Sequence, residues 1–179
     1  PVQVAIAVWP WGSYLGEDAV KVKKSSFIRM HPKSFNPEAK VCGVYVNSIY
    51  ASLEAKREGF DEALLLDHEG NLSEGPGENL FLVRENKLLT PSKGSILPGI
   101  TRDSIMTIAK DEGIAVEEKT LTLKDGKEAS EAFLVGTAAE VTLIGSIDGK
   151  EIGDGNYPIG KKLKEMYLDI VQGKNPKYE

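Results

Sequence analysis

The chain has 179 residues, of which 41% are hydrophobic and 27% charged, a composition that suits one globular domain with a single core. Its 22 Lys and Arg against 27 Asp and Glu give a formal charge of -5, and the basic run from Lys21 to Lys24 is short, which argues against a nucleic-acid groove. A single cysteine, Cys42, cannot form an internal disulfide, and no apolar stretch approaches the roughly 20 residues that cross a bilayer, so a cytoplasmic protein that does not enter membranes is expected.

The N-terminal third predicts two strands and a helix. Residues 2 to 9 form an apolar run that predicts a strand, and residues 21 to 30 predict a second one. Apolar residues then recur at i, i+3, i+4 and i+7, which predicts a helix over residues 44 to 58 that ends at Gly59. Lys40 therefore lies just before a helix, on a short segment that can direct its amine inward.

The middle of the chain predicts a sheet rich in hairpins. Residues 64 to 67 and 79 to 84 have strand-like composition, and a turn at Glu85 and Asn86 leads into a short strand over 87 to 90. Thr101 is a good N-cap for a helix over 102 to 112, with Gly113 as its stop.

The last third predicts a strand over 114 to 118, a short helix near 124 to 130, strands over 131 to 136 and 140 to 146, and a closing helix over about 158 to 172. The apolar stripe of that helix indicates core packing.

The run Glu74-Gly-Pro-Gly-Glu78-Asn79-Leu-Phe81 carries the strongest local signal. Its glycines and proline define a tight backbone path that holds two carboxylates and an amide beside an apolar strand, where charges need partners. Such a run alone is as compatible with an ordinary loop as with a site.

Three further segments occur in an order that resembles a known family: Lys40-Val-Cys-Gly-Val-Tyr45, Leu97-Pro-Gly-Ile-Thr-Arg102 and Gly136-Thr-Ala-Ala-Glu140. From about Val4 to Gly173 the chain resembles the larger, C-terminal part of the fold type IV pyridoxal-phosphate enzymes, most closely the branched-chain amino acid aminotransferases. The resemblance implies an α+β fold, an α/β pseudo-barrel in which helices flank a mixed sheet. It also implies that residues 1–16 are the end of a small N-terminal domain plus an interdomain loop, that residues 17–179 are the cofactor-binding large domain, and that the rest of the small domain is missing.

For the cofactor ring, the resemblance implies four residues. Lys40 would be the catalytic lysine that holds pyridoxal 5'-phosphate as a Schiff base, Glu74 would face the ring nitrogen, Tyr45 would donate to the phenolic oxygen and Leu97 would pack on the ring face. Val44 departs from the family, which has Asn before the tyrosine.

For the phosphate and the substrate, the resemblance implies that backbone N–H groups bind anions. Those of Ile100 and Thr101 would hold the phosphate, and the turn at Thr137 and Ala138 would serve both phosphate and substrate carboxylate. Trp11 and Tyr14 are the side-chain pocket candidates, and Glu78 and Asn79 are expected to support Glu74 through hydrogen bonds.

The resemblance implies transamination of branched-chain L-amino acids (leucine, isoleucine, valine) with 2-oxoglutarate, at low activity for a fragment. D-amino acid aminotransferase, aminodeoxychorismate lyase and a non-catalytic fragment stay open as alternatives. The two histidines suggest neither a metal site nor a hydrolase triad. An unpaired strand over residues 2 to 9 would favour association with a second copy, so a homo-oligomer is expected.

Overall fold

The computed structural model describes residues 2–10, 12 and 14–178. Four α-helices and eight strands are found there, in the order β1 (Val20–Ile28), α1 (Tyr45–Arg57), β2 (Glu62–Leu66), β3 (Asn79–Arg84), β4 (Lys87–Pro91), α2 (Ile100–Asp111), β5 (Val116–Lys119), α3 (Leu123–Lys127), β6 (Glu131–Gly136), β7 (Glu140–Ile147), β8 (Lys150–Glu151) and α4 (Pro158–Val171). Short 3-10 turns cover Cys42–Val44 and Pro176–Tyr178.

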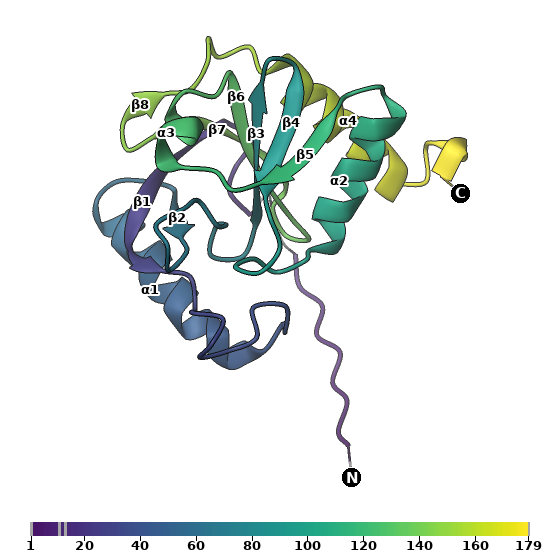
Figure 1. Ribbon diagram of the computed structural model, residues 1–179. Helices are drawn as coiled ribbons and strands as arrows, with labels where there is room; N and C mark the ends of the chain where they lie inside the picture. The colour runs from purple at the N-terminus through teal and green to yellow at the C-terminus, as the bar shows by residue number, and fades with distance from the viewer. Residues whose placement is uncertain (1, 11, 13, 179) are drawn as a thin grey trace.

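All strands join one mixed sheet in the order β2-β1-β7-β6-β3-β4-β5, with β8 on β7. The pairs β1–β2, β1–β7 and β4–β5 are parallel, and the others are antiparallel. Helix α1 packs on β1 and β2, whereas α2 and α4 pack against each other, α2 on β5 and β6 and α4 on β6 and β7 (Figure 1). The predicted mixed sheet with flanking helices is confirmed.

The central strands bury both of their faces, which explains their nearly continuous apolar sequences. Along β3, Leu80 and Leu82 belong to one core cluster, and the alternating Phe81 and Val83 belong to the other, beneath α2 and α4. The rings of Phe81 and Phe133 stack with centroids 5.3 Å apart. The predicted apolar stripe of α4 joins this second cluster through Leu163 and its partly buried neighbours, so its interpretation as core is confirmed.

The predicted strand over residues 2 to 9 is wrong. This segment forms no strand, and Val2, Val4, Ile6 and Val8 are 84–93% exposed. It leaves the body of the molecule as an extended trace (Figure 1). A strand requires a hydrogen-bonded neighbour, and none of the described strands pairs with these residues.

Helix α1 has the predicted periodicity, but its apolar stripe faces solvent. Val46, Ile49, Tyr50 and Leu53 are 43–57% exposed, whereas Ser48, Ala51 and Ala55 are buried. Small residues on the inner face allow the helix to approach β2 closely, where Ala51 and Ala55 pack against Ala63 and Leu65. The helix ends as expected at Gly59, whose φ of 83° is the left-handed conformation that glycine adopts without strain.

Candidate functional site

A pocket of about 240 Å³ lies between the loop after β1, the start of α2 and the end of β6. Most of the sequence motifs meet here. Its lining residues are Glu38, Lys40, Gly77, Leu97, Pro98, Gly99, Ile100, Thr101, Gly136 and Thr137.

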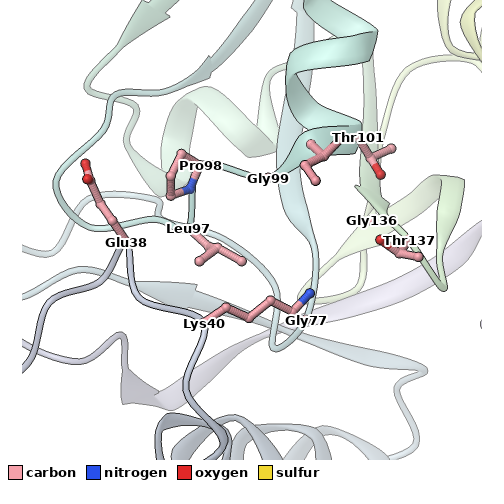
Figure 2. Close-up of a pocket in the computed structure, with 10 residues that line it drawn as sticks. Glu38, Lys40, Gly77, Leu97, Pro98, Gly99, Thr101, Gly136 and Thr137 are labelled. Carbon is pink, nitrogen blue, oxygen red and sulfur yellow. The ribbon is translucent and has the colours of Figure 1, made fainter. Parts of the chain in front are cut away.

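Figure 2 shows how these side chains lie. Leu97 and Pro98 stand on one side of the pocket, Thr101 and Thr137 stand on the other, and the Lys40 side chain runs below them toward Gly77. The carboxylate of Glu38 points away from the other side chains. The predicted site residues Lys40, Leu97, Ile100, Thr101 and Thr137 are therefore brought together around one cavity.

Lys40 is held by a loop of tight turns. The Ala39 N–H donates to Asn36 O at 3.0 Å, and the Val41 N–H donates to Ala39 O at 3.0 Å, just before the 3-10 turn that leads into α1. The lysine side chain is exposed to the pocket rather than packed in the core. Val44 is buried at 5% exposure, so this apolar residue is accommodated by packing.

Helix α2 presents its N-terminus to the pocket. The prediction that Thr101 caps this helix is wrong: the N-cap is Gly99, the helix starts at Ile100, and no side chain caps it. A Cβ on Gly99 would lie 2.2 Å from Asn79 Oδ1, so a larger residue at this cap would displace the Asn79 amide. The first N–H groups of a helix have no acceptor inside the helix, so this end of the pocket suits an anion.

Glu74 lies behind the pocket wall at 3% exposure. Asn79 Nδ2 donates to Glu74 Oε2 at 2.9 Å and to Leu97 O at 2.8 Å, and the Leu97 N–H donates to the same carboxylate at 3.1 and 3.2 Å. The expected supporting role of Asn79 is confirmed by these contacts. Glu78 has a different position: its carboxylate accepts from the Gly77 N–H at 3.0 Å, and none of the hydrogen bonds found for it reaches Glu74.

A small cavity of about 20 Å³ adjoins the pocket that holds Lys40. Arg29, Tyr45 and Glu74 line the small cavity, and Gly77 and Leu97 line both cavities. Lys40 and Glu74 thus line adjoining cavities that have these two residues in common. Leu97 is one of them, and it also holds Glu74 through its backbone N–H.

The substrate-pocket candidates are less closely gathered. Tyr14 and Tyr45 line a second pocket of about 290 Å³ beside Pro76 and Gly77, together with Ile49 and Leu53 of α1. Trp11 lies outside the described residues. Ala138 is exposed in the turn after β6 and is not among the residues that line the Lys40 pocket.

We expect the free energy of unfolding to fall as pH rises from about 5 to about 8. Burial raises the pKa of Glu74 to about 7, although Arg29 pulls it down, and burial together with the Glu62 carboxylate raises the pKa of Glu78 to about 7. In the unfolded chain a Glu titrates near about 4.3. Above the unfolded pKa the native state therefore still holds protons that the unfolded state has lost. The free energy of unfolding falls until the pH passes the native pKa of about 7, by up to about 4 kcal/mol per carboxyl.

Urea unfolding between pH 5 and 8 measures this slope. The variant Glu78→Gln imitates the protonated acid and should reduce the slope of the profile by about half, because Glu74 still titrates, whereas Glu165→Gln on the exposed face of α4 should leave the profile unchanged. Hydrogen bonds from Ser25 and Ser26 lower the pKa of Glu54 to about 2, so the titration of Glu54 affects stability only below pH 5. A profile that rises between pH 5 and 8 would contradict the prediction.

Two buried arginines of the site were missed by sequence reasoning. Arg29, which follows β1, places Nε 2.5 Å from Glu74 Oε1. Arg102, at 2% exposure, donates from Nη2 to Pro91 O at 3.0 Å and to Glu118 Oε2 at 2.7 Å, which ties the start of α2 to β4 and β5. Arg102 lies in the first turn of α2, where a positive charge is unfavourable because of the helix dipole. This unfavourable position was a sequence signal that Arg102 has a specific acidic partner.

Comparison with known proteins gives one family for most of the chain. The family model described as amino-transferase class IV matches residues 1–147. A branched-chain-amino-acid aminotransferase of Pseudomonas aeruginosa is 45% identical in an alignment of 178 positions that covers 97% of this chain and 58% of that protein. A probable branched-chain-amino-acid aminotransferase of Aquifex aeolicus is 41% identical over 99% of this chain and 58% of its own length. The chain therefore spans somewhat more than half the length of these relatives.

Solved structures agree on the fold. A branched-chain aminotransferase of Thermoproteus uzoniensis, crystallised with norvaline, superposes with a TM-score of 0.92 at 45% identity and covers 96% of this chain and 58% of that one. The branched-chain amino acid aminotransferase of Thermobaculum terrenum in its PLP form superposes with a TM-score of 0.89 at 39% identity, over 94% of this chain and 56% of that one. None of the helices among the described residues is long and apolar enough to cross a membrane.

Proposed function

The chain belongs to the class IV aminotransferase family, and we propose that it forms the cofactor-binding part of a pyridoxal 5'-phosphate-dependent branched-chain amino acid aminotransferase. One observation carries the proposal. Lys40 and the buried Glu74 line two adjoining cavities that share Gly77 and Leu97, so one ring between them could reach both groups. In this reading residues 17–179 are the large domain, and residues 1–16 connect it to a smaller one.

The donor set of the pocket fits this cofactor. Pyridoxal phosphate needs an amine for its aldehyde, an acid for its ring nitrogen and N–H donors for its phosphate. Lys40, Glu74 and the α2 N-terminus at Ile100 and Thr101 would supply them, and Tyr45 would donate to the phenolic oxygen. A side chain at Gly99 would meet Asn79 Oδ1, so the residue before the α2 N-terminus carries none.

Each residue would then perform a separate task. When bound, the cofactor supplies an electron sink for the negative charge that develops at the substrate Cα. Lys40 would hold the cofactor and, once displaced by the substrate amine, move the proton that leaves the Cα. Glu74 would hold a proton on the ring nitrogen, and Leu97 would keep the ring against the lysine. The N–H groups after β6, at Thr137 and Ala138, would bind the substrate carboxylate.

The choice of branched-chain substrates rests on the relatives and on the second pocket. The Thermoproteus enzyme was crystallised with norvaline, an amino acid with an unbranched aliphatic side chain. The pocket beside Tyr45 offers apolar walls from Tyr14, Ile49 and Leu53, which suit an aliphatic group. Leucine, isoleucine and valine would donate the amine, and 2-oxoglutarate would accept it.

A single half reaction tests the proposal without requiring full turnover. The protein is loaded with pyridoxal phosphate, mixed with L-leucine, L-isoleucine, L-valine or D-alanine, and followed by cofactor absorbance and by release of the 2-oxo acid. The branched L-amino acids should convert the cofactor to its amine form, and D-alanine should not. Faster conversion by D-alanine would favour a D-amino acid aminotransferase instead.

Borohydride reduction followed by peptide mapping should place a pyridoxyl group on Lys40, and a protein that takes up no cofactor would be a non-catalytic module.

We propose in addition that the protein acts in the cytoplasm as a homo-oligomer. The exposed stripe on α1 and the exposed apolar side chains of residues 2 to 8 are surfaces that association would cover. Light scattering over a range of concentrations should give a mass above that of one chain. A monomer at every concentration would contradict this part of the proposal.

A further inference from the structure

Arg29 occupies a special position beside the acid of the proposed site. Its backbone N–H donates to Leu66 O at 2.7 Å, which fixes the chain directly after β1. Its side chain is 9% exposed, and the Nε atom lies 2.5 Å from Oε1 of Glu74, whose side chain is 4% exposed. A guanidinium and a carboxylate are therefore in contact away from bulk water.

Both the charge of Arg29 and its direct contact favour the ionised form of Glu74. The Nε atom touches the carboxylate, although its N–H does not point along a hydrogen bond to any acceptor among the described residues. The hydrogen bonds to the carboxylate come from neutral groups, the Asn79 amide and the Leu97 N–H. Two further charges act on it from a greater distance: Arg102 on α2, which favours the ionised form, and Glu78 on the same loop, which opposes it.

Burial and the arginine work in opposite directions on this carboxyl. A carboxylate taken out of water takes up a proton unless a cation compensates the lost solvation. An opposite charge in contact lowers the pKa of a carboxyl by about 1–3 units. Because Arg stays protonated at any physiological pH, its charge is always available to Glu74.

We propose that Arg29 is a positioning residue that favours the ionised form of the Glu74 carboxyl against the effect of its burial and holds that carboxyl toward the pocket. The inference rests on the proposed function, because an ionised acid is what a protonated ring nitrogen requires. A Glu74 that held its own proton could not stabilise a second proton on the ring. Arg29 acts on the cofactor only through Glu74, and it is the charge of the side chain rather than its bulk that matters.

The first experiment uses the protein without cofactor. Carbon-13 labelled glutamate reports the titration of Glu74 by NMR, and the variant Glu74→Gln identifies its signal. Arg29→Met removes the charge and keeps an apolar stem, Arg29→Lys keeps a charge, and Arg84→Met is the matched control, since Arg84 is exposed and pairs with Asp125 at 3.2 Å. Arg29→Met should raise the titration midpoint of Glu74 by about one pH unit or more, which is a tenfold gain in proton affinity. Arg29→Lys should leave the Glu74 midpoint close to the wild-type value.

An unchanged midpoint in a folded Arg29→Met protein would overturn the proposal. If that variant does not fold, Arg29→Lys decides: a midpoint near that of the wild type supports the charge role, and a rise of about one unit overturns it.

The second experiment repeats the series with bound pyridoxal phosphate and follows the pH dependence of its absorbance, whose transition should shift in Arg29→Met and not in Arg84→Met. A wild-type protein that binds no cofactor would refute the proposed function, while the cofactor-free titration would still decide the role of Arg29.

Discussion

Replacing Lys40 by alanine is expected to abolish the half reaction, with a rate at least about four orders of magnitude below that of the wild type. The variant loses both the amine that holds the cofactor and the group that moves the Cα proton. Because the side chain is exposed to the pocket and outside both large core clusters, the fold should be retained. Stopped-flow absorbance with L-leucine measures the rate, and borohydride labelling measures the attachment.

Lys33→Ala is the matched control for this change. Lys33 is an exposed lysine of the same loop, and its backbone N–H, which the substitution retains, donates to His31 Nδ1 at 3.0 Å. This variant should label and react as the wild type does. Normal labelling in the Lys40→Ala protein would show that another amine holds the cofactor, and the assignment of Lys40 would fail.

The sheet was well predicted because its strands carry their own pattern. Residues 131 to 136 were expected as a strand and are β6, since an uninterrupted apolar run flanked by turn residues needs no distant information to be recognised. Boundaries were less accurate where the end of an element depends on contacts. The short helix expected near 124 to 130 spans Leu123–Lys127, because its start is set by a capping box between Thr122 and Asp125.

Two predictions were wrong because a local sequence pattern carries no information about which residues are its neighbours in space. Residues 2 to 9 have the composition of a strand but no partner in the described chain. The Gly99 cap is explained by the close approach of Asn79, a residue 20 positions earlier, and Thr101 has the better capping side chain by propensity alone. At Gly99 a tertiary contact overrides the local preference, whereas residues 2 to 9 lack the contact that their local preference requires.

The candidate site was predicted in part. The order of the motifs was sufficient to gather Lys40, Leu97 and Thr137 around one pocket. The contact between Arg29 and Glu74 joins positions 45 residues apart and follows only from the parallel pairing of β1 with β2, which places the end of β1 beside the loop that carries the acid. No local pattern around Arg29 indicates that partner.

Replacing Glu74 by glutamine is expected to lower the rate of the half reaction by about 10²–10³-fold, as removal of one preorganised charge does in other enzymes. Glutamine keeps the shape and can still accept from the Leu97 N–H, but it cannot hold a proton on the ring nitrogen. The loss also leaves the Arg29 cation buried without a counter-charge, which costs about 3–5 kcal/mol of stability. Urea unfolding must therefore accompany the kinetics, so that rates are compared for folded protein.

Glu78→Gln separates the charge effect from the general effect of altering this loop. Glu78 is the other buried carboxyl of the same turn, and its hydrogen bond goes to the Gly77 N–H. Its substitution should leave the rate within about tenfold of the wild type, because the group has no assigned contact with the ring. Equal losses in the two variants would mean that the loop tolerates no change at all, and the ring-nitrogen role of Glu74 would lose its support. The geometry requires that only Glu74→Gln loses most of the half-reaction rate. The pH transition in the absorbance of the bound cofactor should also shift in that variant.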